Sequence, residues 1–241
     1  MSATNTCLVV SFGVMDYLAA YRLQRRVHAL VAALEIPDVL LLLEHPHVYT
    51  HGRRGQQSHI LAPDDALARL GVETHFTDRG GETTYHGPGQ LVGYPIVNLR
   101  RIGMGVRQYV HTLEQTLVGA LAEYGIAAHS DGKPTGVWVD DRKIAAIGVR
   151  VSRSVTMHGF ALNVSPDLSF FDHIVPCGMP DACVTSMARE LVGQEGSHSI
   201  TVPEALPVVA GAFGSEFGLR VECVDRSTIE RALGCGVSSL F

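Results

Sequence analysis

Hydrophobic residues recur at intervals of three or four positions in several segments of the chain, which predicts amphipathic helices there. The clearest of these helices covers residues 106–124, and a second covers residues 16–34 with arginines on its polar side. Shorter helices are predicted over residues 63–70 and 186–192. A last helix is predicted to begin near Pro203.

Short apolar or alternating runs between these helices predict β-strands. They cover residues 8–12, 39–43, 47–50, 72–77, 91–99, 137–139, 143–151 and 155–164. Residues 165–180 are expected to form a long loop, and the chain from residue 224 onward shows no strong pattern. Because the strands look antiparallel and the regular strand–helix alternation of a doubly wound sheet is missing, the pattern indicates an α+β fold.

Length and composition are consistent with a single well-packed domain. The chain has 241 residues, of which 46% are hydrophobic and 18% are charged, and it contains no repeat or low-complexity tract. Its net charge of −5 gives no general attraction to nucleic acid. The first residues lack a basic region, and no apolar run approaches the length of a membrane helix. We therefore expect a cytoplasmic protein without a membrane or nucleic-acid partner.

The five cysteines do not resemble a disulfide framework, because their number is odd and their positions are scattered. They are Cys7, Cys177, Cys183, Cys223 and Cys235. In a reducing compartment each is either a small buried hydrophobic residue or a reactive thiol.

Residues 79–98 form the most unusual stretch of the sequence. Five glycines alternate here with basic, hydroxyl and aromatic side chains, and an apolar run from Leu91 to Val97 follows. Glycine allows positive φ and close approach of the backbone to a ligand. The stretch is therefore predicted to form a wall of a binding site; an ordinary long turn is the alternative.

Two further residues are candidates for catalysis. Cys177 stands between Pro176 and Gly178 at the end of the long loop, where a thiol can be exposed. Lys143 begins an apolar strand, and a lysine held there could activate a thiol or accept a proton. A structural cysteine and a solvated lysine are the alternatives, and the local sequence does not show that the two side chains meet.

Several common sites are missing from the sequence. It contains no P-loop, no dinucleotide fingerprint at a helix start and no Gly-x-Ser-x-Gly elbow. Histidines 45, 47 and 51 invite a metal interpretation, but the closer Cys/His spacing of zinc sites does not occur. No metal and no cofactor are expected.

Four motifs, in this order, resemble the octanoyl-acyl carrier protein:protein octanoyltransferase family, the lipoyl(octanoyl) transferases of lipoate biosynthesis. They are Arg-Gly-Gly-x-x-Thr-Tyr-His-Gly-Pro-Gly-Gln-Leu-Val-Gly-Tyr-Pro (79–95), Gly-x-Trp-Val followed by Lys-Ile-Ala-Ala-Ile-Gly-Val-Arg (136–150), His-Gly-Phe-Ala-Leu-Asn-Val (158–164) and Pro-Cys-Gly-Met-x-x-x-x-Val-Thr-Ser (176–186). The segment Glu-His-Pro-x-Val-Tyr-Thr-x-Gly-Arg-Arg (44–54) also fits, although His51 stands where a small or apolar residue is more usual. The resemblance covers residues 10–222.

The resemblance implies the fold of biotin and lipoate ligase catalytic domains: a large mixed, mostly antiparallel sheet flanked by helices, with a smaller sheet alongside. It implies one catalytic domain over residues 1–222 and a tail over residues 223–241. Cys177 would be the nucleophile that carries the acyl thioester, and Lys143 would lower its pKa. The implied acyl-binding residues are Arg79, Gly80, Gly81, Glu82, Thr83, Thr84, Tyr85, His86, Ala146, Ile147, Gly148, Gly159, Phe160 and Ala161.

The implied activity is transfer of an octanoyl or lipoyl group from acyl carrier protein to a lysine of lipoyl domains, the first step of endogenous protein lipoylation. The expected acceptors are the E2 subunits of 2-oxoacid dehydrogenases and the glycine cleavage H protein. Arginines 22, 25, 53, 54, 100 and 101 could favour an acidic carrier protein. An ATP-dependent lipoate or biotin ligase of the same fold is the alternative, and a catalytically silent binding module is a third.

Overall fold

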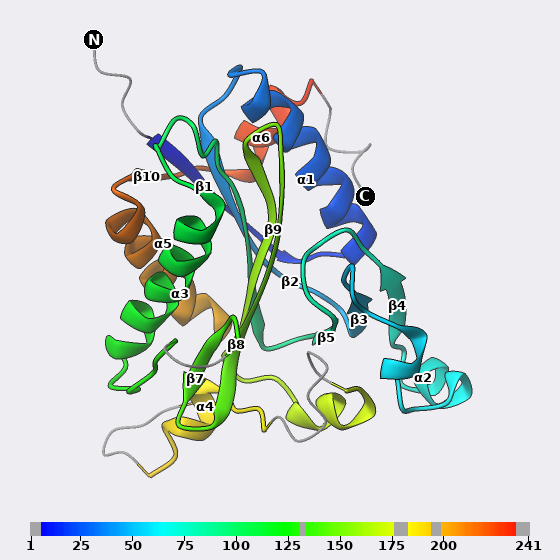
Figure 1. Ribbon diagram of the computed structural model, residues 1–241. Coiled ribbons are helices and arrows are strands. Elements are labelled where there is room, and N and C mark those ends of the chain that lie inside the picture. The colour runs from blue at the N-terminus through cyan, green and yellow to red at the C-terminus, as the bar shows by residue number, and fades with distance from the viewer. Residues whose placement is uncertain (1–5, 131–133, 176–182, 194–198, 235–241) are drawn as a thin grey trace.

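A seven-stranded mixed sheet runs through the centre of the computed structural model (Figure 1), which describes residues 6–130, 134–175, 183–193 and 199–234. Its strands, in spatial order, are β10 (Arg220–Cys223), β1 (Thr6–Val14), β2 (Asp38–Glu44), β6 (Gln90–Ile96), β9 (Val155–Asn163), β8 (Arg142–Ser152) and β7 (Val137–Val139). Strand β1 pairs in parallel with β10 and β2, and every other pairing in this sheet is antiparallel. The predicted α+β fold with a large, mostly antiparallel sheet is confirmed.

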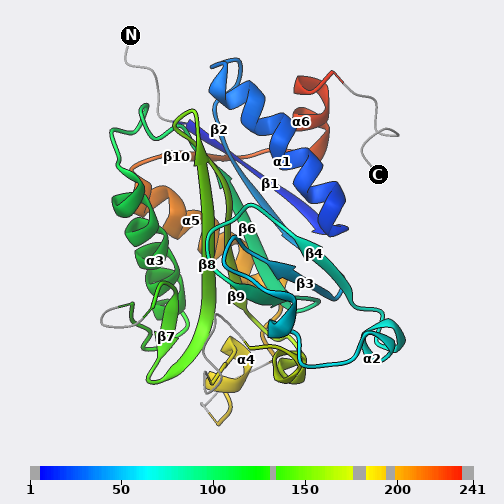
Figure 2. The same ribbon diagram turned by 45° about the vertical axis from the view of Figure 1, so that its right-hand side comes forward.

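The smaller sheet expected beside the large one is also present (Figure 2). It consists of β4 (Glu73–Phe76), β3 (Val48–His51) and β5 (Thr83–His86), with β3 parallel to β4 and antiparallel to β5. The short helix α2 (Asp64–Arg69) and the 3₁₀ turns η1 (Gln57–His59) and η2 (Leu168–His173) lie near it. This sheet holds the glycine-rich stretch in place, because β5 is part of that stretch.

Helices cover both faces of the large sheet (Figures 1 and 2). The helices α1 (Tyr17–Ala32) and α6 (Arg226–Ala232) lie on one face, α3 (Val106–Ala122) and α5 (Val202–Phe217) lie on the other, and α4 (Met187–Glu190) follows η2 near one end. Alternate residues of β2 enter different cores: Leu40 and Leu42 pack with α3 and α5, and Leu41 packs with α1. The continuous apolar run of β2 is thus explained by burial on both faces. None of the described helices combines the length and hydropathy that a membrane-spanning helix requires.

Local capping fixes the ends of the principal helices. The Asp16 carboxylate accepts a hydrogen bond from the Ala19 N–H at 2.9 Å at the start of α1. A reciprocal capping box joins Thr201 and Glu204 at the start of α5, and Gly218, with φ of 61°, ends that helix. The helices predicted over residues 16–34, 106–124 and from Pro203 onward are therefore confirmed.

Strands β5 and β10 and helix α6 were not predicted from the pattern, and neither were the 3₁₀ turns η1 and η2. Strand β5 lies inside the glycine-rich stretch, where the neighbouring glycines obscure the strand preference of its Thr and Tyr residues, and it pairs with the distant strand β3. The predicted domain boundary at residue 222 lies inside β10, and α6 follows β10. Ile229 of α6 is only 1% exposed, because it packs into the core beneath α1. The tail thus contributes packing to that face, and the domain division itself stays a prediction.

Candidate active site

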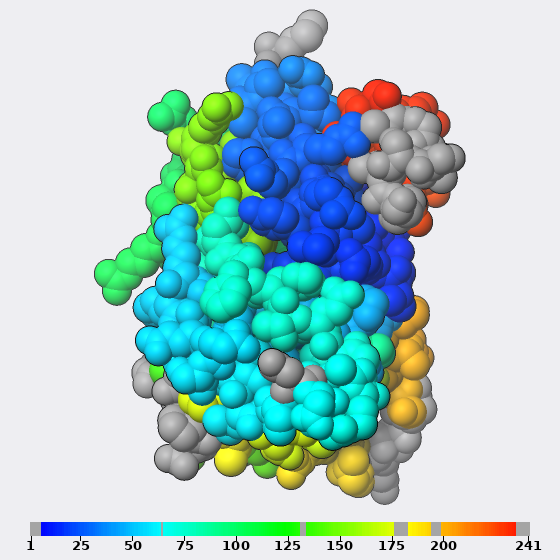
Figure 3. Space-filling model, turned by 90° about the vertical axis from the view of Figure 1, so that its right-hand side faces the viewer, coloured from blue at the N-terminus to red at the C-terminus, as the bar shows by residue number. Residues whose placement is uncertain are grey.

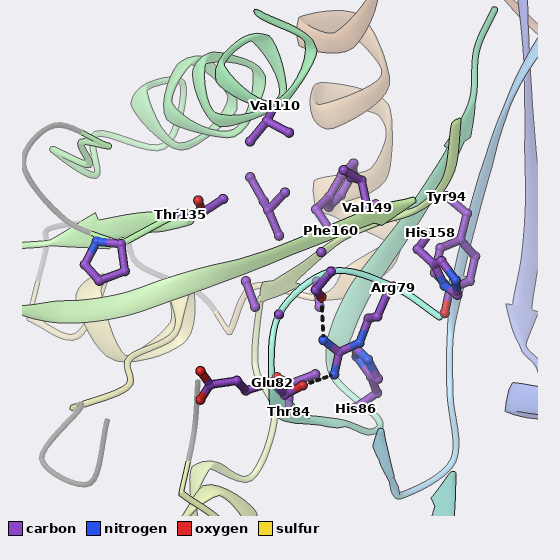
Figure 4. Close-up of a pocket in the computed structure, with 18 of the residues that line it drawn as sticks. Arg79, Glu82, Thr84, His86, Tyr94, Val110, Thr135, Val149, His158 and Phe160 are labelled. Carbon is purple, nitrogen blue, oxygen red and sulfur yellow. Dashed lines mark hydrogen bonds between the residues drawn. The ribbon is translucent and has the colours of Figure 1, made fainter. Parts of the chain in front are cut away.

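A cavity of about 450 Å³ lies between the glycine-rich segment 79–82 and the strands β8 and β9 (Figure 4). Tyr94 and His158 lie toward one end of it, and Val110 and Thr135 toward the other. Its lining residues are Tyr17, Arg54, Arg79, Gly80, Gly81, Glu82, Thr84, His86, Tyr94, Val110, Pro134, Thr135, Lys143, Ala146, Ile147, Gly148, Val149, His158, Gly159, Phe160 and Ala161. A concave site with mixed apolar and polar lining is the usual form of a small-ligand site.

Glycines let the backbone of segment 79–82 lie directly against β8. The Gly80 N–H donates to the carbonyl oxygen of Val149 at 2.9 Å. A Cβ on Gly148 would stand only 2.8 Å from the Gly80 carbonyl oxygen, and Gly81 has a φ of 89° that L side chains rarely adopt. The stretch predicted to be a wall of a binding site does form one wall of the cavity.

The Arg79 side chain clamps this wall from inside and is only 8% exposed. Its guanidinium donates to the carbonyl oxygens of Glu82 at 2.7 Å and Gly80 at 3.0 Å (Figure 4). It donates to the carbonyl oxygen of Thr50 at 2.6 Å. It also donates to the Thr50 hydroxyl. The arginine therefore orders segment 79–82 and adds a fixed positive charge to the wall.

Neutral aromatic and imidazole rings surround the end of the cavity that Tyr94 and His158 mark. Burial lowers the pKa of His45 to about 4, and it is also the main cause of the lowered pKa values of His86 and His158. The His45 Nε2 and the Tyr94 hydroxyl are 2.7 Å apart, and the Tyr17 ring lies 5.4 Å from that of His45. These imidazoles are uncharged at neutral pH, and the fixed charge near them, the Arg79 guanidinium, is bonded to main-chain carbonyl oxygens.

Asp78 fixes His158 from behind the cavity. Its carboxylate accepts hydrogen bonds from His158 at 2.8 Å, Arg150 at 2.6 Å and the Tyr21 hydroxyl at 3.1 Å. The hydrogen bond from His158 is the largest cause that lowers the pKa of Asp78 to about 2. One carboxylate thereby ties α1, β8 and β9 to the start of the glycine-rich segment.

Lys143 lines the same cavity and is 6% exposed. Its Nζ lies 5.1 Å from the centroid of the Trp138 ring. Gly136 leaves room for it, because a Cβ there would stand 2.5 Å from the Lys143 Cε. The Gly136 N–H in turn donates to the buried Glu114 carboxylate at 3.0 Å. Helix α3, through Glu114, thus fixes the backbone against which the lysine side chain lies.

The chain that carries Cys177 is anchored on both sides, although Cys177 itself lies outside the described residues. On the amino-terminal side the Val175 N–H donates to a main-chain carbonyl at 2.8 Å. On the other side the Lys143 N–H donates to the Cys183 carbonyl at 2.8 Å, and the Thr185 N–H donates to the Lys143 carbonyl at 3.0 Å. The second anchor is thus the backbone of Lys143 itself.

Most of the predicted acyl-binding residues line the cavity: Arg79, Gly80, Gly81, Glu82, Thr84, His86, Ala146, Ile147, Gly148, Gly159, Phe160 and Ala161. Thr83 and Tyr85 do not line it, because alternate residues of β5 point to opposite faces. The Tyr85 ring instead packs against Phe170 and Phe171. Contact of any of these residues with a substrate stays a prediction.

Several lining residues were not singled out from the sequence: Tyr17, Tyr94, Val110, Pro134, Thr135, Val149 and His158. Tyr94 and His158 belong to the quoted motifs, so the motif boundaries could have included them in the site. Tyr17 begins α1 and Val110 lies in the second turn of α3, and neither carries a local signal. Only the packing of α1 and α3 on the sheet brings them to the cavity.

The histidines considered as metal ligands have separate partners. His45 bonds to Tyr94, the Nδ1 of His47 lies 2.9 Å from a tyrosine hydroxyl, and the Nδ1 of His51 lies 2.8 Å from a threonine hydroxyl. In the part of the chain that the structure describes, no group of three or more His, Cys, Asp or Glu could hold a metal ion. Among the cysteines, Cys7 is fully buried, and burial raises the pKa of its thiol.

The architecture first defines a class, the lipoate ligase-like α+β domains. A crystal structure of lipoate-protein ligase A bound with ATP superposes with a TM-score of 0.71 over 95% of this chain and 92% of that chain, at 13% identity. A putative lipoate protein ligase from Thermoplasma acidophilum gives a TM-score of 0.69 over 92% and 90%, at 14% identity. Likeness at such low identity shows the fold alone.

Sequence similarity then gives the family. Residues 16–214 match the lipoyl protein ligase A/B catalytic domain, and the chain belongs to this family. It is 44% identical to the mitochondrial octanoyltransferase LIP2 of Arabidopsis thaliana, over 88% of this chain and 91% of the relative. It is 54% identical to an octanoyltransferase of Solibacter usitatus, over 76% of this chain and 83% of that relative. It is 48% identical to an octanoyltransferase of Acidothermus cellulolyticus, over 89% of this chain and 93% of that relative. The similarity is thus to acyltransferases, and the ligase alternative is not favoured.

Proposed function

We propose that this chain transfers an octanoyl group, or a lipoyl group, to a lysine of lipoyl domains in protein lipoylation. The observation that carries the proposal is its identity of 44–54% to octanoyltransferases over most of its length. The cavity is consistent with this activity, because it combines an apolar lining with a buried lysine in one wall. The donor would be octanoyl-acyl carrier protein.

In the first half-reaction the Cys177 thiolate attacks the thioester carbonyl of the donor. The carbon–sulfur bond to phosphopantetheine breaks, and the leaving thiolate takes a proton from the Lys143 ammonium. One thioester replaces another, so the step is nearly isoenergetic. Lys143 would stabilise the thiolate as a neighbouring cation.

The anchors on the chain around Cys177 support its approach to Lys143. Cys183, whose carbonyl is bonded to the Lys143 backbone, is the sixth residue after Cys177. Six residues span at most about 20 Å when fully extended. Chain length therefore keeps Cys177 within that distance of Cys183, which is compatible with the proposed pairing.

In the second half-reaction an acceptor lysine attacks the acyl-enzyme. Its amine forms the amide, the Cys177 thiolate leaves, and the proton released from the amine passes to a base, for which Lys143 is the candidate. Conversion of a thioester to an amide is downhill, so the transfer requires no ATP. The covalent intermediate implies ping-pong kinetics.

The partners follow from the same proposal. Lipoyl domains in general are the acceptors that the family supports, and the E2 subunits of 2-oxoacid dehydrogenases and the glycine cleavage H protein are the particular ones proposed. Of the arginines considered for carrier docking, Arg54 lines the cavity with its side chain 74% exposed, whereas Arg101 is bonded to the buried Asp38. The cytoplasmic location also stays a prediction, and the Arabidopsis relative is named as mitochondrial.

An intact-mass measurement tests the proposal. The protein is incubated with octanoyl-acyl carrier protein and no ATP, and the expected product is an octanoyl adduct that Cys177→Ser does not form. Addition of a lipoyl domain should then discharge the adduct and leave an octanoylated lysine on the acceptor. An absolute requirement for ATP would favour the ligase alternative and overturn the proposal.

A further inference from the structure

A second hollow of about 330 Å³ lies beside the first, between the start of α1 and the end of β4. Figure 3 views the molecule from the side on which α1, in blue, borders the small sheet, in cyan. Tyr17, Leu18 and Tyr21 line the hollow from α1, and Phe76, Thr77 and Asp78 line it from the other side. It is open to solvent at Phe76, which is 69% exposed.

Tyr17 is the one residue that lines both hollows. Its side chain is 4% exposed, and its ring lies parallel to the rings of His75 and His86 at centroid distances of 5.5 and 6.4 Å. Its hydroxyl makes no hydrogen bond of ordinary geometry among the described residues, although Thr77 lies near it. The side chain is thus held by ring packing, and it stands as a partition between the two spaces.

This partition lies at the end of the cavity that is remote from Lys143. Val149 pairs with His158, and both line the cavity near Tyr94. The end of the Lys143 side chain lies close to the Ala145 carbonyl oxygen, because both flank the same point beside Gly136. Val149 is four residues further along β8, which corresponds to about 13 Å in a β-strand. The rings of His45 and His86 connect Tyr17 to this same end.

We infer that Tyr17 determines the longest acyl chain that the cavity accepts. The inference rests on the proposed function: with the thioester carbonyl at Lys143, the methyl end of the acyl chain points toward Tyr17. A longer acyl chain fits only if it displaces the Tyr17 ring, which is packed on the imidazoles of His75 and His86. Removal of the ring would join the two hollows and give a longer chain apolar contacts with Leu18 and Phe76.

The size of the effect follows from the burial of methylene groups. Each added methylene that leaves water contributes about fourfold to binding or to the rate constant kcat/KM when space exists for it. In the wild type this gain stops where the partition begins. In Tyr17→Ala it continues into the second hollow, so the ratio of dodecanoyl to octanoyl transfer should rise at least about tenfold.

The test measures acyl-adduct formation by intact mass with a series of acyl-acyl carrier proteins from hexanoyl to hexadecanoyl. Wild type, Tyr17→Ala, Tyr17→Leu and Tyr17→Phe are compared, with Leu18→Ala as the matched control that alters only the second hollow. We expect Tyr17→Ala, and to a smaller extent Tyr17→Leu, to shift the rate maximum to longer chains. Tyr17→Phe should keep the wild-type limit because the ring remains, and so should Leu18→Ala.

Each outcome has a distinct meaning. If the wild type forms no octanoyl adduct, the proposed function fails. If the wild type forms the octanoyl adduct but reacts as fast with dodecanoyl-acyl carrier protein, the inference about Tyr17 is wrong and the proposed function stands. The same conclusion follows if both Tyr17→Ala and Tyr17→Leu keep the wild-type profile. Should Tyr17→Ala not fold, as its thermal unfolding would show, Tyr17→Leu and the wild-type series decide the question.

Discussion

Asp78→Asn should destabilise the protein at neutral pH and do so much less in acid. The wild-type carboxylate is bonded to His158, Arg150 and Tyr21, and these contacts lower its pKa from 3.8 to about 2. A lowering of this size corresponds to about 2 kcal/mol of folding free energy. Because the side chain is 32% exposed, solvent screening reduces the expected loss to about 1 kcal/mol.

The sign of the pH dependence follows from the direction of the shift. The folded pKa of Asp78 lies below the unfolded value, so its contribution is complete above about pH 4 and is lost as the pH falls through about 2. Near pH 3 the unfolded carboxyl is mostly protonated, and about half of the contribution is gone. The difference between wild type and Asp78→Asn should therefore narrow by about half from pH 7 to pH 3.

Urea unfolding of both proteins at pH 7, 5, 4 and 3 measures this difference. Asp140→Asn is the matched control, because Asp140 is 83% exposed beside Arg142 and should lose no more than about 0.5 kcal/mol. Asparagine also tolerates the positive φ of 51° at that position. A difference for Asp78→Asn that stays constant from pH 7 to pH 3 would refute the electrostatic explanation.

Two further predictions concern the lysine. Lys143→Ala should yield a folded protein in which iodoacetamide alkylates Cys177 several-fold more slowly at neutral pH. An unchanged alkylation rate would mean that Lys143 does not activate the thiol. Gly136→Ala places a Cβ 2.5 Å from the Lys143 Cε, and residue 136 has a φ of 138° that alanine rarely adopts. We therefore expect formation of the acyl adduct to slow at least about tenfold and the free energy of unfolding to fall by about 1–3 kcal/mol. Gly119→Ala, with no atom within 4 Å of the new Cβ inside α3, should instead be neutral or stabilising; equal effects of the two changes would contradict this reasoning.

The sequence by itself determined the principal helices, most of the strands and the character of the glycine-rich stretch. Helical spacing identifies α1, α3 and α5, and the unbroken apolar run of β2 indicates burial on both faces. These features are readable because periodicity and glycine content express local geometry. The motifs around Lys143 and Cys177 likewise named the candidate chemistry.

Only the tertiary structure decided which side chains share a cavity. Strand β5 exists because β3 pairs with it, and its alternation separates His86, which lines the cavity, from Tyr85, which does not. Tyr17 reaches the cavity because α1 packs across β9 and β6, a contact between segments far apart in the chain. Such contacts depend on the packing of whole elements, which no local pattern of residues encodes.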